Sequence, residues 1–338
     1  MREQASENNI DQTESRRKST FSAIVSNKQL GDVTLLEPLT RLMAERTGQP
    51  VALFVKDVFK PLIALMPHAV WGPDADVHFD EVLCTDWGSK SAVRVRRCLA
   101  RLKRLLCNRP DHIRWWYHLI YREVICKAHE PFEAEYWGLY FWRVLGGDTT
   151  QFVSSRLNLP PAQWRHPQVP TQPFMVIVPT SAWPEKLWSD VQWSSVIKTL
   201  GGRFGKSLRI LMLGGMQEFE KSHCANIEAS SDYKVVNLCG QTNLKQYLHA
   251  LSRAEVVLSV DGSGSHLAQA FDRPTVTLFG ITEDRLWHYA TPKNICLASR
   301  QFTEDGTMAT TDIIPARAVL EAFDRVYSIR ATTFQRMA

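Results

Sequence analysis

Residues 256–271, Val-Val-Leu-Ser-Val-Asp-Gly-Ser-Gly-Ser-His-Leu-Ala-Gln-Ala-Phe, decide the fold of this chain. The first five are mostly apolar and predict a buried, parallel strand. A loop over 261–265 holds two glycines and two serines, and apolar residues at helical spacing then predict a helix that begins near His266. A strand that leads through such a loop into a helix is typical of a doubly wound α/β sheet.

This loop has features that phosphate sites use. Free backbone N–H groups at the start of a helix attract negative charge, and Gly262 and Gly264 lack the Cβ that would keep a phosphate oxygen away. Asp261 follows the strand at the edge where open α/β sheets bind ligands. The loop matches neither G-x-G-x-x-G nor the P-loop pattern. Two interpretations therefore stay open at this point, a phosphate site and a connection that binds nothing.

Alternating strands and helices lie on both sides of a proline-rich connector at 158–173. Before it, the pattern predicts strands at 21–26 and 51–55 around a helix at 33–46; after it, strands at 174–178, 208–213, 234–238, 256–260 and 275–280. We therefore predict an N-terminal domain over 21–165 and a C-terminal domain over 172–320. A disordered tail at 1–20 precedes them, and a closing helix and tail at 321–338 follow.

The composition excludes several classes of protein. The chain has 338 residues, of which 44% are hydrophobic and 22% charged, as in soluble globular proteins. No apolar run is long enough for a membrane span and the N-terminus lacks a signal-peptide core, so we expect a cytoplasmic protein. Seven scattered cysteines without C-x-x-C or metal-ligand spacing predict reduced thiols and no metal site.

The segment from 90 to 127 is strongly basic, with eleven Lys and Arg residues against two acidic ones. Its spacing predicts a helix with an arginine stripe on one face, which is either a solvated surface or a binding surface for an anion. Nearby aromatic residues raise nucleic acid as a partner, but no nucleic-acid motif accompanies them and we predict none. The stripe consists of Arg94, Arg97, Arg101 and Arg104.

Asp32 lies in the loop after the first predicted strand, at the carboxyl edge of the first sheet. Aspartate is a favoured helix N-cap, so this residue is either a structural cap or a functional acid. The spacing alone leaves both interpretations open.

Four motifs in order make the chain resemble glycosyltransferase family 9, the heptosyltransferases of lipopolysaccharide core assembly. They are Gly31-Asp32 with Pro38, Lys186-Leu187-Trp188, the run 237–244, and the run 261–268 followed by 278–282. The resemblance extends from about residue 21 to 329 and implies the GT-B fold, two Rossmann-like domains that face a central cleft. It implies inverting transfer of heptose from ADP-heptose, a nucleotide-sugar donor, to a lipopolysaccharide-core-type acceptor, without a metal cofactor.

The resemblance also implies roles for single residues. Asp32 would be the general base that takes the proton of the acceptor hydroxyl, and Lys186 would stabilise the leaving diphosphate. The arginine stripe would bind an anionic glycolipid acceptor at the inner membrane face, to which the protein is peripheral. The implied donor-binding residues are Ser181, Glu218, Asp261, Gly262, Ser263, Gly264 and His266.

Two positions depart from the family pattern. Ala182 stands where the family often has Thr or Ser, which removes one hydrogen bond to the donor phosphates, and Ser263 stands where the family has Gly. Lys186, His266 and Glu218 also have purely structural interpretations, as a surface lysine, a helix-start residue and a solvated first-turn acid. The alternatives are therefore a transferase that uses another nucleotide sugar or a protein acceptor, and a GT-B binding module without turnover.

Overall fold

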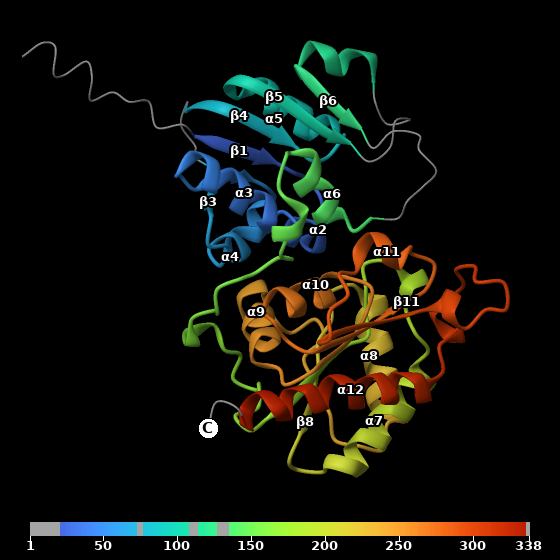
Figure 1. Cartoon of the computed structure of the whole chain (residues 1–338). Helices are drawn as coiled ribbons and strands as arrows, with labels where there is room; N and C mark the ends of the chain where they lie inside the picture. Colours follow the sequence, from blue (N-terminus) through green and yellow to red (C-terminus); the bar gives the residue numbers. More distant parts are fainter. Residues whose placement is uncertain (1–20, 73–76, 108–113, 127–134, 336–338) are drawn as a thin grey trace, which may run out of the picture. The chain divides into compact units, whose positions relative to one another are not determined.

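Two six-stranded parallel sheets organise the described part of the chain (Figure 1). The computed structural model describes residues 21–72, 77–107, 114–126 and 135–335, so the predicted tail at 1–20 lies outside it. Sheet A has the order β3-β2-β1-β4-β5-β6 and sheet B the order β12-β11-β10-β7-β8-β9. Each sheet, numbered from its own first strand, has the order 3-2-1-4-5-6 of a dinucleotide-binding fold. The doubly wound architecture predicted from the sequence is therefore present twice.

The strands have short, apolar cores. Sheet A contains β1 (Ser22–Val25), β2 (Val51–Phe54), β3 (Ala69–Trp71), β4 (His78–Cys84), β5 (Leu99–Cys107) and β6 (Glu123–Cys126). Sheet B contains β7 (Phe174–Val178), β8 (Arg209–Met212), β9 (Val236–Asn237), β10 (Val257–Val260), β11 (Thr275–Phe279) and β12 (Asn294–Ala298). Every residue of β7, β10 and β11 is buried, because helices cover both faces of sheet B.

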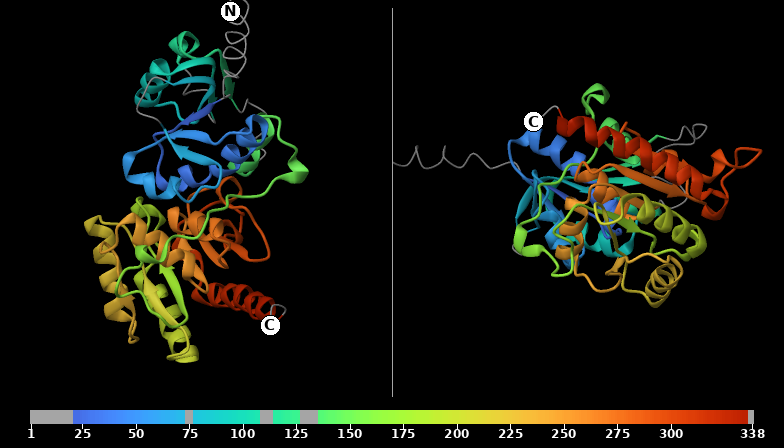
Figure 2. Two further views of the ribbon diagram at one scale, coloured as in Figure 1. Left: turned by 90° about the vertical axis from the view of Figure 1, so that its left-hand side faces the viewer. Right: turned by 90° about the horizontal axis from the view of Figure 1, so that it is seen from below.

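Helices α7 (Asp190–Phe204), α8 (Glu218–Ser230) and α12 (Ala316–Gln335) pack on one face of sheet B, and α9 (Leu244–Arg253) and α10 (Ser263–Ala270) on the other (Figure 1). Helix α12, red in Figure 2, contacts α7, β11 and β12. The Trp188 and Trp193 rings meet edge to face 4.9 Å apart in the core beneath α7. The other helices are α2 (Leu30–Thr34), α3 (Glu37–Thr47), α4 (Lys60–Ile63), α5 (Ser89–Arg97), α6 (Trp137–Val144) and α11 (Asp284–Trp287).

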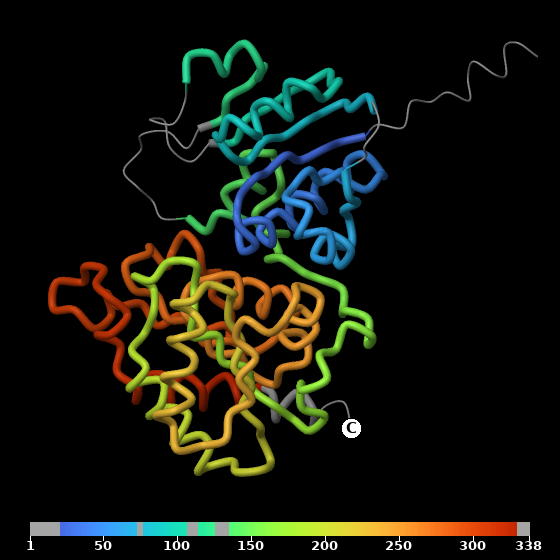
Figure 3. Tube along the Cα trace, turned by 180° about the vertical axis from the view of Figure 1, so that it is seen from behind, coloured from blue at the N-terminus to red at the C-terminus, as the bar shows by residue number. Residues whose placement is uncertain are grey.

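The chain divides into two compact units whose boundaries do not follow the sequence order. One unit contains sheet A; the other contains sheet B together with residues 28–39 and 56–67, and therefore α2 and α4. The connector between 153 and 173, green in Figure 3, belongs to the second unit and runs along its outside. Two backbone hydrogen bonds hold it there, from Leu157 N–H to the Ala270 carbonyl (2.9 Å) and from Asn158 N–H to the Leu65 carbonyl (2.8 Å).

The prediction of one helix with an arginine stripe over Arg94, Arg97, Arg101 and Arg104 is wrong. Helix α5 ends at Arg97 and strand β5 begins at Leu99, with an extended Cys98 (φ −67°, ψ 132°) between them. No glycine or proline marks the end of α5, and 99–107 contains no β-branched residue, so the sequence there has weak strand signals. Pairing of β5 with both β4 and β6 overrides that local preference.

Two predicted boundaries also change. The helix predicted at 33–46 is two helices, α2 and α3, because the Pro38 ring would collide with the carbonyl four residues earlier in one continuous helix. The loop predicted at 261–265 ends at Gly262, the N-cap of α10, so the helix begins at Ser263 rather than near His266. The strands β3, β4, β5, β6 and β12 had no counterpart among the predicted strands.

Gly264 allows α10 to approach β7 closely. A Cβ at this position would lie 2.9–3.0 Å from the side chain of Val178. We therefore expect Gly264→Ala to lower the free energy of unfolding by about 1–3 kcal/mol, measured by urea titration. The matched control is Gly202→Ala in α7, where an added Cβ meets nothing within 4 Å, and which should gain about 0.4–1 kcal/mol. Equal effects of the two substitutions would contradict the close packing of α10 on β7.

Candidate functional site

The candidate site lies at the carboxyl edge of sheet B, where the strand order reverses between β7 and β10. Open α/β sheets bind ligands at this switch point, because the loops that leave neighbouring strands diverge there. Ser181, which follows β7, and Asp261, which follows β10, are both buried. A Cβ added to Gly262 would lie 3.7 Å from the Ser181 hydroxyl oxygen, so these loops lie side by side.

Lys186 and Asp261 form an ion pair across this edge. The Lys186 ammonium donates to Oδ2 of Asp261. The Asp261 side chain is 4% exposed and that of Lys186 19%, so little water competes with their interaction. Lys186 is the last residue of a single 3-10 turn, Pro184–Lys186, in the segment after β7.

The N-terminus of α10 supplies free backbone N–H groups at the same edge. Gly262 is the N-cap with an extended backbone and, as a glycine, has no side chain that could accept a hydrogen bond from the first turn. The Ser265 hydroxyl donates to the Gly262 carbonyl (2.9 Å), and the Ser263 hydroxyl is hydrogen-bonded to Tyr247 from α9. Tyr247 is a contact that the sequence reasoning missed. The first turn of α10 thus presents the positive end of the helix dipole to an anion.

Helix α2 brings Asp32 to this cluster. Asp32 lies in the first turn of α2 and accepts a hydrogen bond from Gln29 N–H (3.2 Å), so it is not the N-cap residue. The preceding Gly31 packs against α10: a Cβ there would lie 2.9 Å from Cδ2 of His266 and 3.5 Å from Cα of Ser263. A glycine is required at this contact because any side chain would separate the two helices.

His266 is the group on which the charges of the site converge. Burial lowers the pKa of His266 below its ordinary value, the Asp261 and Asp32 carboxylates oppose that shift, and Lys186 adds to it. Its ring lies 6.4 Å from the ring of Trp287. Because all three charges act on one imidazole, the structure places Asp32, Asp261 and Lys186 around His266.

Four histidines, three of them buried and one half-buried, should make stability depend on pH. Burial holds the pKa of each below the ordinary 6.5. The unfolded chain then binds more protons below pH 6.5, so their stabilising contribution is present above that pH and is lost as the pH falls. Each adds at most about 1.4 kcal/mol per pH unit to the slope. The residues are His223, His249, His266 and His288.

We expect urea titrations to give a lower free energy of unfolding at pH 5.5 than at pH 7.5, a window above the titration of ordinary carboxylates. His288→Gln should reduce this slope, because the substitution removes one of these imidazoles. The His288 ring nitrogens Nδ1 and Nε2 are hydrogen-bonded to the Gln269 amide nitrogen at 3.3 Å and to the Asn294 carbonyl oxygen at 3.1 Å. Stability that is unchanged or higher at pH 5.5 would contradict the neutral state of these imidazoles.

Two glutamates of α8 have different surroundings. Glu218, the predicted donor-binding residue, is 87% exposed and forms an ion pair with Lys221 (2.5 Å). Glu220 is buried and accepts hydrogen bonds from Gly215 N–H (3.1 Å) and Gln217 N–H (3.2 Å), which close the loop after β8. The Gln-x-x-Glu spacing of a capping box, Gln217 to Glu220, was the sequence signal for this contact. The role of Glu218 stays a prediction.

The four arginines predicted as one stripe have separate environments in the first unit. Arg104 pairs with Glu81 (3.2 Å) and Glu123 (2.8 Å), so its charge is neutralised within sheet A. Arg101 is 80% exposed and reaches Asp80 at 4.0 Å. Binding of an acceptor by these residues stays a prediction.

The other two belong to α5. The guanidinium carbon of Arg94 lies 5.1 Å from the centre of the Phe54 ring, and Arg97 is exposed at the end of the helix. Arg94 and Arg97 therefore share a helix, whereas Arg101 and Arg104 share a strand.

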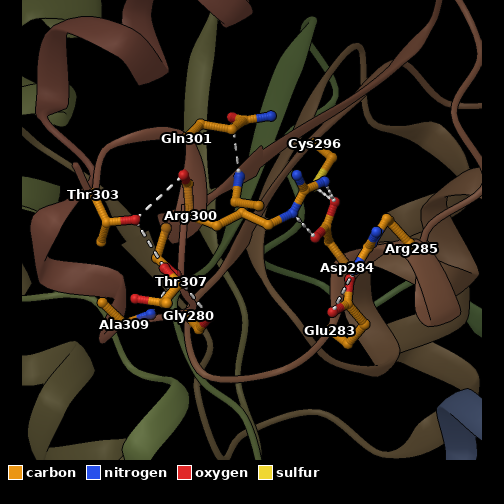
Figure 4. Close-up of polar contacts among 12 residues, drawn as sticks. Gly280, Glu283, Asp284, Arg285, Cys296, Arg300, Gln301, Thr303, Thr307 and Ala309 are labelled. Carbon is orange, nitrogen blue, oxygen red and sulfur yellow. Dashed lines mark hydrogen bonds and ion pairs between the residues drawn. The ribbon is translucent and has the colours of Figure 1, made fainter. Parts of the chain in front are cut away.

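A partly buried ion pair fixes the loop after β11 (Figure 4). Arg300 donates from Nε and Nη2 to the two carboxylate oxygens of Asp284, at 2.7 and 2.9 Å. The guanidinium, through its hydrogen bonds and charge, keeps the pKa of Asp284 below its usual range although burial opposes the shift. This pair fixes the start of α11, whose last residue, Trp287, contacts His266. The sequence analysis did not predict the ion pair between Arg300 and Asp284.

Thr311 holds the backbone next to Lys186. Its hydroxyl is fully buried and lies 3.2 Å from the Lys186 carbonyl oxygen and 2.8 Å from that of Leu187. The loop that carries the Lys186 ammonium is therefore tied to the segment after β12. No sequence motif pointed to this residue.

Residues 100–314 match the family described as glycosyltransferase family 9 (heptosyltransferase). A curated relative, lipopolysaccharide heptosyltransferase 3 from Escherichia coli, is 25% identical over 186 residues, 50% of this chain and 53% of the relative. The chain thus aligns with about half the length of that relative. The region that matches the family includes Lys186, Asp261 and the loop at 261–266.

Two solved structures share the fold. A glycosyl transferase family 9 protein from Veillonella parvula gives a TM-score of 0.74 at 14% identity, over 91% of this chain and 97% of that one. The E. coli ADP-heptose lipopolysaccharide heptosyltransferase II gives 0.73 at 15% identity, over 94% and 100%. The predicted α/β fold of GT-B type is confirmed by these likenesses and by the two Rossmann-like sheets.

No described helix is both long enough and apolar enough to cross a membrane. No group of three or more His, Cys, Asp and Glu residues in the same part of the chain could hold a metal ion. Since the family match extends over more than half of its residues, this chain belongs to glycosyltransferase family 9.

Proposed function

We propose that this protein is an inverting glycosyltransferase that moves heptose from ADP-heptose to a lipopolysaccharide-core-type acceptor, an anionic glycolipid at the inner membrane face. The observation that carries the proposal is the arrangement of Asp32, Asp261 and Lys186 around His266 at the N-terminus of α10. This arrangement combines a proton acceptor, a cation and helix N–H groups at one sheet edge. The E. coli and Veillonella parvula structures support the family context.

The reaction assigns one step to Asp32. The acceptor hydroxyl oxygen attacks the anomeric carbon of the donor, and the Asp32 carboxylate takes its proton. The bond between that carbon and the β-phosphate oxygen breaks, and its electron pair leaves with ADP. Attack opposite the leaving group inverts the anomeric carbon. Asp32 is suited to this task because, among the described residues, its carboxylate accepts a single long hydrogen bond, from Gln29 N–H at 3.2 Å.

The leaving diphosphate develops negative charge as the bond breaks. Lys186 supplies a cation, and the first turn of α10 supplies fixed dipoles that need no reorganisation. Binding of the diphosphate would draw Lys186 from Asp261, whose carboxylate is then able to accept hydrogen bonds from the donor sugar. Ser181, buried beside Gly262, is placed to donate to a phosphate oxygen.

The test is a transfer assay with the purified full chain, ADP-heptose and a deacylated core oligosaccharide. We expect ADP release that depends on the acceptor and a product heavier by one heptose residue in the mass spectrum. UDP- and GDP-sugars and an acceptor protein serve as the competing substrates. Nucleotide release only with another donor or acceptor would support the alternative transferases. Donor binding without nucleotide release would support a binding module, the alternative that Ala182 favours.

A further inference from the structure

Two cysteine thiols meet in the core of the second unit. Cys224 lies within α8 and Cys239 in the segment after β9, and both belong to the buried cluster around sheet B. Both are free thiols, and their side chains are hydrogen-bonded to each other. Two sulfurs in hydrogen-bond contact need only a short approach to reach the disulfide bond length of about 2.05 Å.

The neighbours of Cys239 hold its sulfur in this position. The thiol donates to the Gly215 carbonyl oxygen at 3.5 Å, and the Cys239 N–H donates to Oδ1 of Asn237 at 3.1 Å. A Cβ added to Gly214 would lie 2.5 Å from the Cys239 sulfur, so the loop after β8 packs directly on it. The sulfur is therefore confined between that loop and Cys224 of α8.

The two thiols differ in acidity. The hydrogen bond with Cys224 lowers the pKa of Cys239, and the positive charge of Lys221 adds to this shift, whereas burial and Glu220 oppose it. The hydrogen bond with Cys239 and burial both raise the pKa of Cys224. Since the thiolate is the reactive form of cysteine, Cys239 is the nucleophile of the pair and Cys224 is the protonated thiol beside it.

The two thiols also differ in access to solvent. Cys239 is 5% exposed and is followed by the half-buried Gly240 and the exposed Gln241, whereas Cys224 is 0% exposed. A small oxidant therefore reaches Cys239 first, and the Cys224 sulfur meets only its partner. A thiolate with some access to solvent and a second thiol in contact with it is the arrangement that redox-sensitive cysteines use.

We propose that Cys224 and Cys239 form a modification site, a dithiol that hydrogen peroxide converts reversibly to an intramolecular disulfide. The Cys239 thiolate attacks one oxygen of the peroxide, the O–O bond breaks and hydroxide leaves, which gives a sulfenic acid at Cys239. The Cys224 sulfur then attacks the Cys239 sulfur, so that the S–S bond forms, the S–O bond breaks, and the departing oxygen leaves as water with the Cys224 proton. The peroxide is reduced and the two thiols are oxidised. The proposal does not depend on the sugar donor or on the transfer reaction.

The test is oxidation of the reduced full chain with a small excess of hydrogen peroxide, followed by alkylation of the remaining thiols in denaturant and peptide mapping by mass spectrometry. We expect a disulfide between the peptides that contain Cys224 and Cys239, and its complete loss on treatment with dithiothreitol. Cys224→Ala should abolish this disulfide and leave Cys239 as a sulfenic acid that dimedone traps. Cys239→Ala should leave Cys224 as an unmodified thiol.

Cys98→Ser is the matched control, because Cys98 is also a free thiol and is more exposed than either member of the pair. It should leave the yield of the disulfide unchanged. Recovery of Cys224 and Cys239 as alkylated thiols, or accumulation of the sulfenic acid in the unsubstituted chain without a disulfide, would overturn the proposal. An equal yield of this disulfide from the chain unfolded in urea would also overturn it, because the native contact would then not direct the reaction. These measurements on the unsubstituted chain decide the proposal even if a variant fails to fold.

Discussion

Replacing Asp32 with asparagine is expected to lower turnover by about 10²- to 10⁴-fold, because the amide cannot take the proton of the attacking hydroxyl. The substitution keeps the size of the side chain and an oxygen that can accept from Gln29 N–H. Stability and donor affinity should therefore change little. Turnover is measured as ADP release, donor affinity by calorimetry, and stability by urea titration.

Glu45→Gln controls for the loss of one negative charge near the start of the chain, since Glu45 is exposed in α3. It should have wild-type turnover. If Asp32→Asn transfers heptose at the wild-type rate, Asp32 is not the base. If the variant instead loses donor affinity and turnover together, Asp32 acts by binding the donor.

Replacing Lys186 with methionine is expected to lower both turnover and stability. Turnover should fall by about 10²- to 10³-fold, as for other groups that stabilise charge on a leaving group or oxyanion. The Asp261 carboxylate is 4% exposed and would lose its partner, and a buried charge left unpaired costs about 3 kcal/mol of unfolding free energy or more. Both quantities are measured on the same preparation.

The double variant Lys186→Met, Asp261→Asn separates the two effects. It removes the unpaired charge, so stability should recover, whereas turnover should stay low because the cation is still absent. Lys198→Met is the matched control: Lys198 pairs with Asp232 on the surface at 3.2 Å, and loss of such an exposed pair costs little. Recovery of turnover in the double variant would show that Lys186 only neutralises Asp261.

Much of the second sheet could be predicted from the sequence, because its strands are short apolar runs bounded by turn residues. The pattern predicted β7, β8, β10 and β11 within one or two residues of their ends. β12 was missed because asparagine and cysteine dilute the apolar pattern of 294–298. It becomes a strand because it pairs with β11 along its whole length.

The first sheet was harder to predict because its middle is basic and lacks β-branched residues. A helix and the strand after it, α5 and β5, have charged residues at spacings that imitate one long helix. Only the pairing of β5 between two other strands distinguishes the two structures, and that information is not local.

The site shows the same division between local and tertiary information. The sequence pointed to Asp32, Lys186 and Asp261, and the structure brings all three to His266. The buried carboxylate of α8 is Glu220 rather than Glu218, and the capping-box spacing from Gln217 to Glu220 was a local signal for it that the prediction did not use. The sequence could not reveal Thr311, which reaches Lys186 across 125 residues of chain.

Helix α2 belongs to the compact unit built on sheet B, although it lies near the start of the chain. The proposed base therefore shares one unit with the groups proposed to bind the diphosphate. Sheet A and α5 belong to the other unit and take no part in the proposed bond-breaking step. Residues of that unit can therefore change, by natural divergence or by engineering, to suit new acceptors, while the residues that carry out the reaction stay the same.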